Sequence, residues 1–244
     1  LEEWDEKLLL TVPQRGISRH VVRFVASEGR VYALKEIAES LARHEYAVLG
    51  ELEREGMPSV SVLGLCVDRP DDQQAILVTR YLEYSMSYRY LFSSPRGEHS
   101  ADRLVDTLVE LLVRLHLSGT FWGDCSLSNT LFRRDAGSFA AYLVDAETGE
   151  LHPTLSHGQR TYDLDLARTN IAGELLDLEA GGLLHETIDP VETSDQVVQR
   201  YCSLWDELLG AETFDTGERF RIDQRIRRLN ELGFDVAELN IITD

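Results

Sequence analysis

The sequence has little cysteine, a shortage of basic residues and no long hydrophobic run, and each of these features excludes a class of protein. The three cysteines lie far apart and form no Cys-x-x-Cys pair, which argues against a disulfide scaffold or a zinc site and favours reduced thiols in the cytoplasm. Lys and Arg number 24 against 43 Asp and Glu, and the net charge of −19 opposes binding to nucleic acids or anionic membranes. No apolar run approaches the roughly 20 residues that span a bilayer.

The first third of the chain has the pattern of strands around one helix. At 244 residues, the chain can form one large domain or two small lobes, given roughly 150 residues per domain. Apolar, β-branched segments predict four strands, the first two joined by the turn Glu28-Gly29-Arg30, at residues 20–25, 31–37, 60–67 and 75–78. Residues 38–54 predict a helix whose apolar stripe is Leu41, Tyr46, Leu49 and Leu52.

The rest of the chain is mostly helical in pattern. Periodic apolar residues predict helices at residues 101–117, 163–178, 194–209 and 219–228. A short hairpin is predicted from residues 130–132 and 141–144. The last helix is basic, and we interpret its charged side as a solvated face rather than an anion-binding patch. The sequence therefore predicts an α+β chain with a β-rich lobe at residues 1–82 and a helical lobe at residues 83–244.

One Asp–Asn pair lies in a loop between the first long helix of this second lobe and the hairpin. An Asp and an Asn five positions apart can serve phosphoryl transfer, because the carboxylate orients a hydroxyl group and the amide oxygen binds Mg²⁺. Asp124 and Asn129 have this spacing, and so do the pairs at 165–170 and 235–240. In a helix, five positions correspond to about 140° of rotation, so we interpret these other two pairs as chance. Irregular backbone after Gly123 can turn Asp124 and Asn129 to one point.

A cluster of acidic residues and one lysine are further candidates for a phosphate and metal site. Asp145 follows the apolar strand at 141–144, and Glu147 and Glu150 come soon after it; such a cluster suits a hard cation, although it is also typical of a surface turn. Lys35 lies in an otherwise apolar strand, and a buried ammonium group needs a partner. Glu45 on the following helix is a candidate for that partner. The alternative is a lysine at the edge of a strand that reaches solvent.

The order of these residues resembles that of the protein-kinase-like superfamily. Ala33-Leu34-Lys35 resembles the Ala-x-Lys of its third strand, and Glu45 opens a segment similar to the Glu helix of small bacterial kinases. Their catalytic loop is resembled by Leu115-His116-x-x-Gly119-x-x-x-Gly123-Asp124-x-Ser126-x-x-Asn129. The similarity is closest to lipopolysaccharide-core kinases and aminoglycoside phosphotransferases, and more narrowly to a bacterial lipopolysaccharide-kinase-like family; it extends over about residues 15–178.

This resemblance implies a two-lobed kinase-like fold and a role for each matching residue. Lys35 would contact the α- and β-phosphates of ATP, with Glu45 holding it, and Asp124 would position or deprotonate the acceptor hydroxyl. Asn129 and Asp145 would coordinate Mg²⁺. The nucleotide would also contact a phosphate-covering loop and the segment after the fourth strand, through Gly16, Ser18, Arg80, Tyr81 and Leu82.

The sequence also departs from the family pattern. Residues 15–19 contain one glycine in place of a G-x-G-x-x-G loop, Trp122 stands where a His is usual, and Asp145-Ala146-Glu147 replaces Asp-Phe-Gly. No Ala-Pro-Glu motif follows Asp145, which argues against a peptide substrate.

The function implied is an ATP- and Mg²⁺-dependent phosphotransferase of the bacterial cytoplasm. Its acceptor would be a hydroxyl group of a small molecule or sugar, with no nucleic-acid partner and no membrane span. Two alternatives stay open. A pseudokinase would hold nucleotide as a regulatory or interaction module without turnover, and a metal-dependent hydrolase would use Asp124, Asp145 and Glu147 independently of Lys35.

Overall fold

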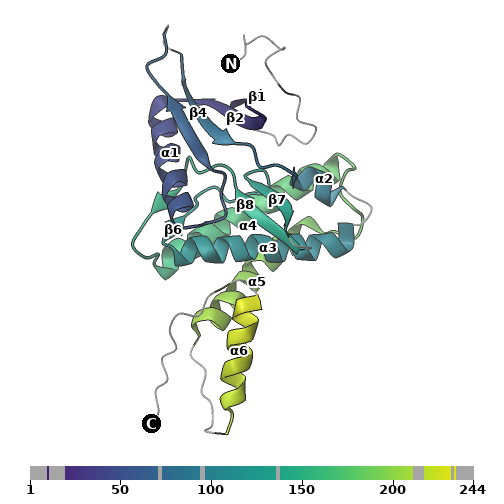
Figure 1. The fold of residues 1–244 in the computed structure, drawn as a ribbon. Coiled ribbons are helices and arrows are strands. Elements are labelled where there is room, and N and C mark those ends of the chain that lie inside the picture. Colours follow the sequence, from purple (N-terminus) through teal and green to yellow (C-terminus); the bar gives the residue numbers. More distant parts are fainter. Residues whose placement is uncertain are drawn as a thin grey trace.

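The computed structural model has a β-sheet at one end and a layer of long helices beneath it (Figure 1). It describes residues 10, 20–70, 73–93, 97–135, 138–210, 217–231 and 234. Gly16 and Ser18 of the predicted phosphate-covering loop lie outside the described residues. Within these ranges, no helix combines the length and the apolar character that crossing a membrane requires.

The N-terminal part is a four-stranded antiparallel sheet with one helix against it. Across the sheet the strands follow the order β1 (Val21–Ser27), β2 (Arg30–Ile37), β4 (Ala75–Arg80) and β3 (Val62–Cys66). β1 and β2 form the predicted hairpin, and Glu28 and Gly29 at its turn both have positive φ angles, as a type I′ turn requires. Helix α1 (Glu39–Arg54) contacts β3 and β4.

The buried face of α1 differs from the predicted apolar stripe. Leu49 and Leu52 are buried as predicted, but Leu41 and Tyr46 are 38% and 40% exposed, so that part of the prediction is wrong. The buried face instead includes Glu45, which is only 1% exposed. Because Glu45, Leu49 and Leu52 are spaced by four and three residues, they lie on one side of the helix. This face brings an acidic side chain up against the sheet.

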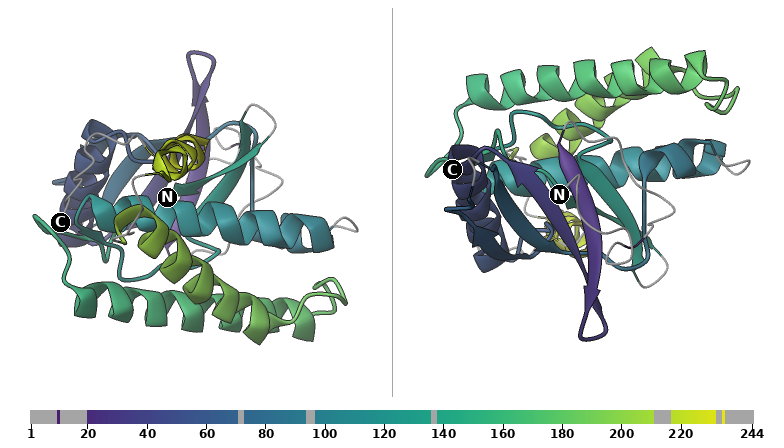
Figure 2. Two further views of the ribbon diagram at one scale, coloured as in Figure 1. Left: turned by 90° about the horizontal axis from the view of Figure 1, so that it is seen from below. Right: turned by 90° about the horizontal axis from the view of Figure 1, so that it is seen from above.

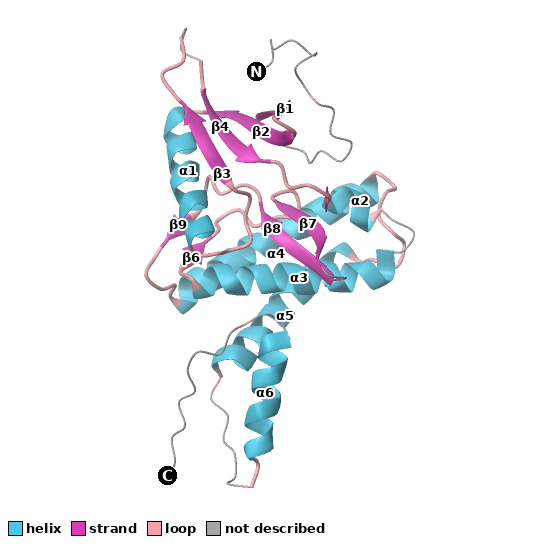
Figure 3. Ribbon diagram, in the orientation of Figure 1, coloured by secondary structure: helices cyan, strands magenta, loops and turns pink. Residues whose placement is uncertain are grey.

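Helices make up most of the C-terminal part, and two small sheets accompany them (Figure 3). The longest are α3 (Gly97–Leu117), α4 (His157–Ala180) and α5 (Pro190–Leu209). Helix α5 contacts both others and runs obliquely between them (Figure 2). The remaining elements are the sheet β5 (Ser85–Met86), β7 (Thr130–Asp135) and β8 (Ser138–Leu143), the pair β6 (Thr120–Phe121) and β9 (Glu150–Leu151), and the helices α2 (Tyr88–Phe92) and α6 (Arg219–Glu231).

One large apolar core joins the two parts. The α3 side chains predicted to face it are each at most 2% exposed: Leu104, Leu108, Leu111, Leu112 and Leu115. The same cluster takes in side chains of α1, β4, α4 and α5. Apolar burial at about 25 cal/mol per Å² is the main favourable term in folding, so this cluster holds sheet and helices together. The α+β fold with a β-rich first part and a helical second part is the predicted one.

Candidate active site

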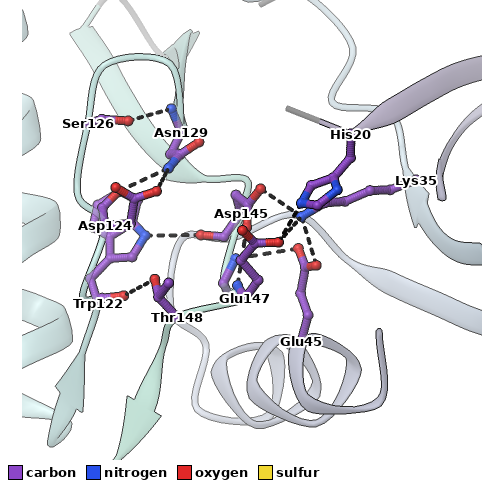
Figure 4. Close-up of polar contacts among 11 residues, drawn as sticks. His20, Lys35, Glu45, Trp122, Asp124, Ser126, Asn129, Asp145, Glu147 and Thr148 are labelled. Atoms are coloured by element: carbon purple, nitrogen blue, oxygen red, sulfur yellow. Dashed lines mark hydrogen bonds and ion pairs between the residues drawn. The ribbon is translucent and has the colours of Figure 1, made fainter. Parts of the chain in front are cut away.

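A cavity of about 580 Å³ lies where the N-terminal sheet meets the loops of the C-terminal part. Every described residue of the predicted site lines it: Lys35, Glu45, Arg80, Tyr81, Leu82, Asp124, Asn129 and Asp145. Figure 4 shows Lys35 and Glu45 pointing toward Asp145, with Asp124 and Asn129 together on a neighbouring loop. The structure therefore brings these side chains into one cleft, and their roles there stay predictions.

The Lys35 ammonium group is the centre of a cluster of ion pairs. Its Nζ lies 2.9 Å from Glu45 Oε2 on α1, 2.6 Å from Asp145 Oδ2 after β8 and 3.5 Å from Glu147 Oε2. Lys35 is 9% exposed, so it is not a lysine that reaches solvent. Alternation along β2 sets its direction: Leu34 packs in a separate apolar cluster, and Lys35 faces the cleft.

Burial and the nearby opposite charges shift the pKa values of Lys35 and Glu45 in opposite directions. Burial by itself would lower the pKa of Lys35, but the attraction of Glu45 and Asp145 outweighs it, so the pKa is raised and the amine stays protonated. Burial, together with the negative charge of Asp145, raises the pKa of Glu45 to about 7 despite the nearby ammonium group. Carboxylate oxygens of Glu45, Asp145 and Glu147 lie within 4.8 Å of one another, and such hard donors suit a divalent cation like Mg²⁺.

The loop between β6 and β7 holds Asp124 and Asn129 together. Asn129 Nδ2 donates hydrogen bonds to the Asp124 carbonyl oxygen at 3.0 Å and to its Oδ2 at 3.1 Å. The backbone N–H of Asn129 donates to Ser126 Oγ at 3.2 Å. Gly123 begins the turn at φ +77°, where a Cβ atom would lie 2.9 Å from the Thr148 carbonyl oxygen, so a glycine is required. The spacing that singled out this Asp and Asn corresponds to a real contact.

Two buried side chains, Trp122 and Asp163, fix this loop to its surroundings. Trp122, at the position where a His is usual, is fully buried, and its Nε1 donates to the Asp145 carbonyl oxygen at 3.0 Å. Asp163 of α4 accepts hydrogen bonds from the backbone N–H groups of Trp122 at 2.8 Å and Gly123 at 2.9 Å, and it lies 3.1 Å from His116 Nε2. Sequence reasoning missed Asp163. In the sequence, the only sign of its role is that an acidic residue occupies the apolar face of a predicted helix.

Helix α4 supplies two more residues that the sequence did not assign to the site. Glu174 accepts hydrogen bonds from the backbone N–H groups of Leu127 at 2.7 Å and Ser128 at 3.0 Å, and burial raises its pKa. Asn170, whose spacing from Asp165 was interpreted as chance, donates a hydrogen bond to Asp124. Neither has a local sequence signal, because the packing of α4 against the loop brings them there.

Comparisons with known proteins show what the chain is similar to. A family model described as the lipopolysaccharide kinase (Kdo/WaaP) family matches residues 28–175, and a domain of unknown function (DUF4032) matches residues 203–244. Among solved structures, WaaP in complex with acyl carrier protein matches with a TM-score of 0.53 and 17% identity, over 90% of this chain and 89% of that chain. No curated protein matches the sequence. The structural likeness shows a shared fold, and the first family match includes every described residue of the predicted site.

Proposed function

The chain belongs to the lipopolysaccharide kinase (Kdo/WaaP) family of kinase-like phosphotransferases, and we propose that it transfers the γ-phosphoryl group of ATP, with Mg²⁺, to a hydroxyl group of a sugar or other small molecule. The supporting observation is that Lys35 Nζ lies 2.9 Å from Glu45 Oε2 and 2.6 Å from Asp145 Oδ2. Asp124 and Asn129 line the same cavity. An ammonium group, two oxygen ligands and a carboxylate around one space meet the requirements of phosphoryl transfer.

On the nucleotide side, each residue has one task in this proposal. Lys35 binds phosphate oxygens, and the buried Glu45 keeps its ammonium group in place. Asp145 and the amide oxygen of Asn129 would hold Mg²⁺. The amide nitrogen of Asn129 donates a hydrogen bond to Asp124, which leaves the amide oxygen as the group for the metal. A bound Mg²⁺ neutralises charge on the phosphates. Adenine would lie against residues 80–82, which follow β4 along the cavity wall.

On the acceptor side, Asp124 is the acting group. Its carboxylate accepts a hydrogen bond from the acceptor hydroxyl and directs that oxygen toward the γ-phosphorus. As the new O–P bond forms and the bond to the leaving ADP breaks, the hydroxyl proton passes to Asp124. Positioning and charge neutralisation supply most of the rate in reactions of this kind, so the protein forms no covalent intermediate.

Nucleotide-dependent thermal stabilisation tests the proposal. We expect MgATP to raise the unfolding midpoint of the wild-type chain. Lys35→Ala should reduce that rise with or without Mg²⁺, and Asp145→Asn should remove only the Mg²⁺-dependent part. Arg43→Ala on the exposed side of α1 and Asp195→Asn on α5 are matched controls that should respond like the wild type. A wild-type response in both site variants would contradict the proposal.

The two alternative functions predict other outcomes. A pseudokinase, suggested by Asp145-Ala146-Glu147 in place of Asp-Phe-Gly, would bind nucleotide without turnover. ATP consumption that is abolished by Asp124→Asn would exclude it. A hydrolase that is indifferent to Lys35 is disfavoured by the geometry, because Lys35 Nζ lies within 3.5 Å of two of its three proposed carboxylates, those of Asp145 and Glu147.

A further inference from the structure

Asn170 on α4 lies directly against the Asp124 carboxylate. Its Nδ2 is 3.1 Å from Asp124 Oδ1 and 3.2 Å from the Cys125 carbonyl oxygen. Both partners accept hydrogen bonds, so the amide nitrogen of Asn170 faces them, and its two hydrogens serve the two acceptors. The contact therefore fixes the direction of the Asn170 side chain as well as that of Asp124.

Asp124 is in this way held by two amide groups from different elements. Asn129 of the loop donates to Oδ2 and Asn170 of α4 donates to Oδ1, both at 3.1 Å. The terminal torsion of an aspartate is broad, so the orientation of its carboxylate depends on such donors. Asn129 is also a proposed Mg²⁺ ligand. The hydrogen bonds of Asn170 go to Asp124 and Cys125, so its effect on the carboxylate does not depend on the metal.

The position of Asn170 also marks one side of the cavity. Asn170, Gly173 and Asp177 follow one another at helical spacing along α4 and line the cavity that Asp124 lines. In Figure 4, Lys35 lies beyond Asp145 as seen from Asp124. The proposed phosphate-binding groups are thus on that far side, and α4 forms the wall next to Asp124.

We propose that Asn170 is a positioning residue for phosphoryl transfer, holding the Asp124 carboxylate toward a hydroxyl group that enters along α4. The inference rests on the proposed function, because it assumes that Asp124 acts on the acceptor. A carboxylate can accept about four hydrogen bonds, so amide donors on both oxygens are compatible with an acceptor hydroxyl as an additional donor. Loss of the Asn170 amide leaves Asp124 in place but poorly oriented, which slows the chemical step rather than nucleotide binding.

Phosphate release from ATP, with water as the acceptor, tests this role by separating kcat from KM. We expect Asn170→Ala to lower kcat about 10- to 100-fold, since misplacing a reacting group by about 1 Å costs about 100-fold, and to leave KM for ATP within about twofold. Asn170→Asp should lower kcat at least as much, because it replaces a donor with a second carboxylate. Asn230→Ala, at an exposed position of α6, is the matched control and should keep wild-type kinetics.

Three outcomes would overturn the inference. If Asn170→Ala keeps kcat within about twofold while Asp124→Asn abolishes turnover, Asn170 has no positioning role and the proposed function stands. If Asn170→Ala raises KM for ATP and lowers the unfolding midpoint along with kcat, its role is structural. If the wild-type chain releases no phosphate that depends on Asp124, the proposed function fails and the inference fails with it.

Discussion

Glu45 is a carboxylic acid in an almost closed environment, next to Lys35 and Asp145. Its pKa is raised from 4.5 to about 7, first by burial and then by the charge of Asp145. Between these values the folded chain binds more protons at Glu45 than the unfolded chain, so the stabilising contribution is complete below about pH 4.5 and is lost as the pH rises through about 7. We expect the wild-type unfolding midpoint to fall from pH 5 to pH 8, more steeply than that of Glu45→Gln.

A pH series of thermal unfolding curves, without nucleotide or metal, measures this difference in slope. The raised pKa corresponds to about 3 kcal/mol, so the effect is large enough to detect. Lys35 does not contribute to the pH dependence of the unfolding midpoint in this range. Its pKa is raised from 10.5, so the amine stays protonated from pH 5 to pH 8. Glu39→Gln changes an exposed carboxylate on the same helix and should keep the wild-type slope. Parallel curves for the wild type and Glu45→Gln would contradict the prediction.

At the residue scale, the sequence predicted those site residues that lie in a recognisable order along the chain. Lys35, Glu45 and Asp145 meet at 2.9 Å or less, although 110 positions separate Lys35 from Asp145. Asp163 and Asn170 were missed, because a single polar residue on a helix reveals nothing about what that helix packs against. The contact of Asn129 with Asp124 is local and could be predicted from the loop, whereas the contact of Asn170 with Asp124 depends on tertiary packing.

Among the elements, the pair β6 and β9 depends on one glycine just before it. Gly119 has φ +82°, and a Cβ atom there would lie 2.0 Å from the His152 carbonyl oxygen. Because backbone rather than a flexible side chain is in the way, we expect Gly119→Ala to lower the free energy of unfolding by at least about 2 kcal/mol. In contrast, Gly173→Ala adds a Cβ atom that meets nothing within 4 Å, inside a helix, and should raise it by about 0.5–1 kcal/mol.

Urea unfolding of both glycine variants provides the measurement, with the two alanine substitutions serving as controls for each other. Equal stability changes of the same sign would show that the approach of residue 119 to residue 152 does not constrain the fold.

Element boundaries followed from the sequence only where apolar periodicity reached the end of the element. Helix α4 begins at His157 rather than at residue 163, because Ser156 and Gln159 form a capping box before the periodic residues start. Likewise, α5 begins at Pro190 behind the N-cap Asp189 rather than at residue 194. The elements α2, β5, β6 and β9 were not predicted, since two to five residues carry no measurable period.

The whole molecule carries a net charge of −19, and its proposed nucleotide is also an anion. Long-range repulsion should slow their encounter, and added salt screens that repulsion. We expect the association rate constant of a fluorescent ATP analogue with Mg²⁺, followed by stopped flow, to rise a few-fold from low salt to about 0.2 M salt. A neutral nucleoside is the control and should show little change. A rate that falls with salt would contradict the prediction.

At this scale the sequence predicted the two-part α+β architecture, because strands and helices are segregated along the chain. The division at residues 82 and 83 stays a prediction. The cleft itself could not be derived from the chain order, since its shape depends on how α1, the loop before β7 and α4 pack around one cavity. Residues 15–19, which have a single glycine in place of the G-x-G-x-x-G loop, also lie outside the described residues.

The position of Trp122 next to the cleft has a consequence for the fluorescence of the protein. Its indole is sealed from water and is hydrogen-bonded to the backbone of a proposed metal ligand, Asp145. The chain thereby contains a natural fluorophore one hydrogen bond away from Asp145, which lines the proposed active site. With Trp4 and Trp205 replaced by Phe, the emission of this one indole would report the filling of the cleft in real time, without any attached dye.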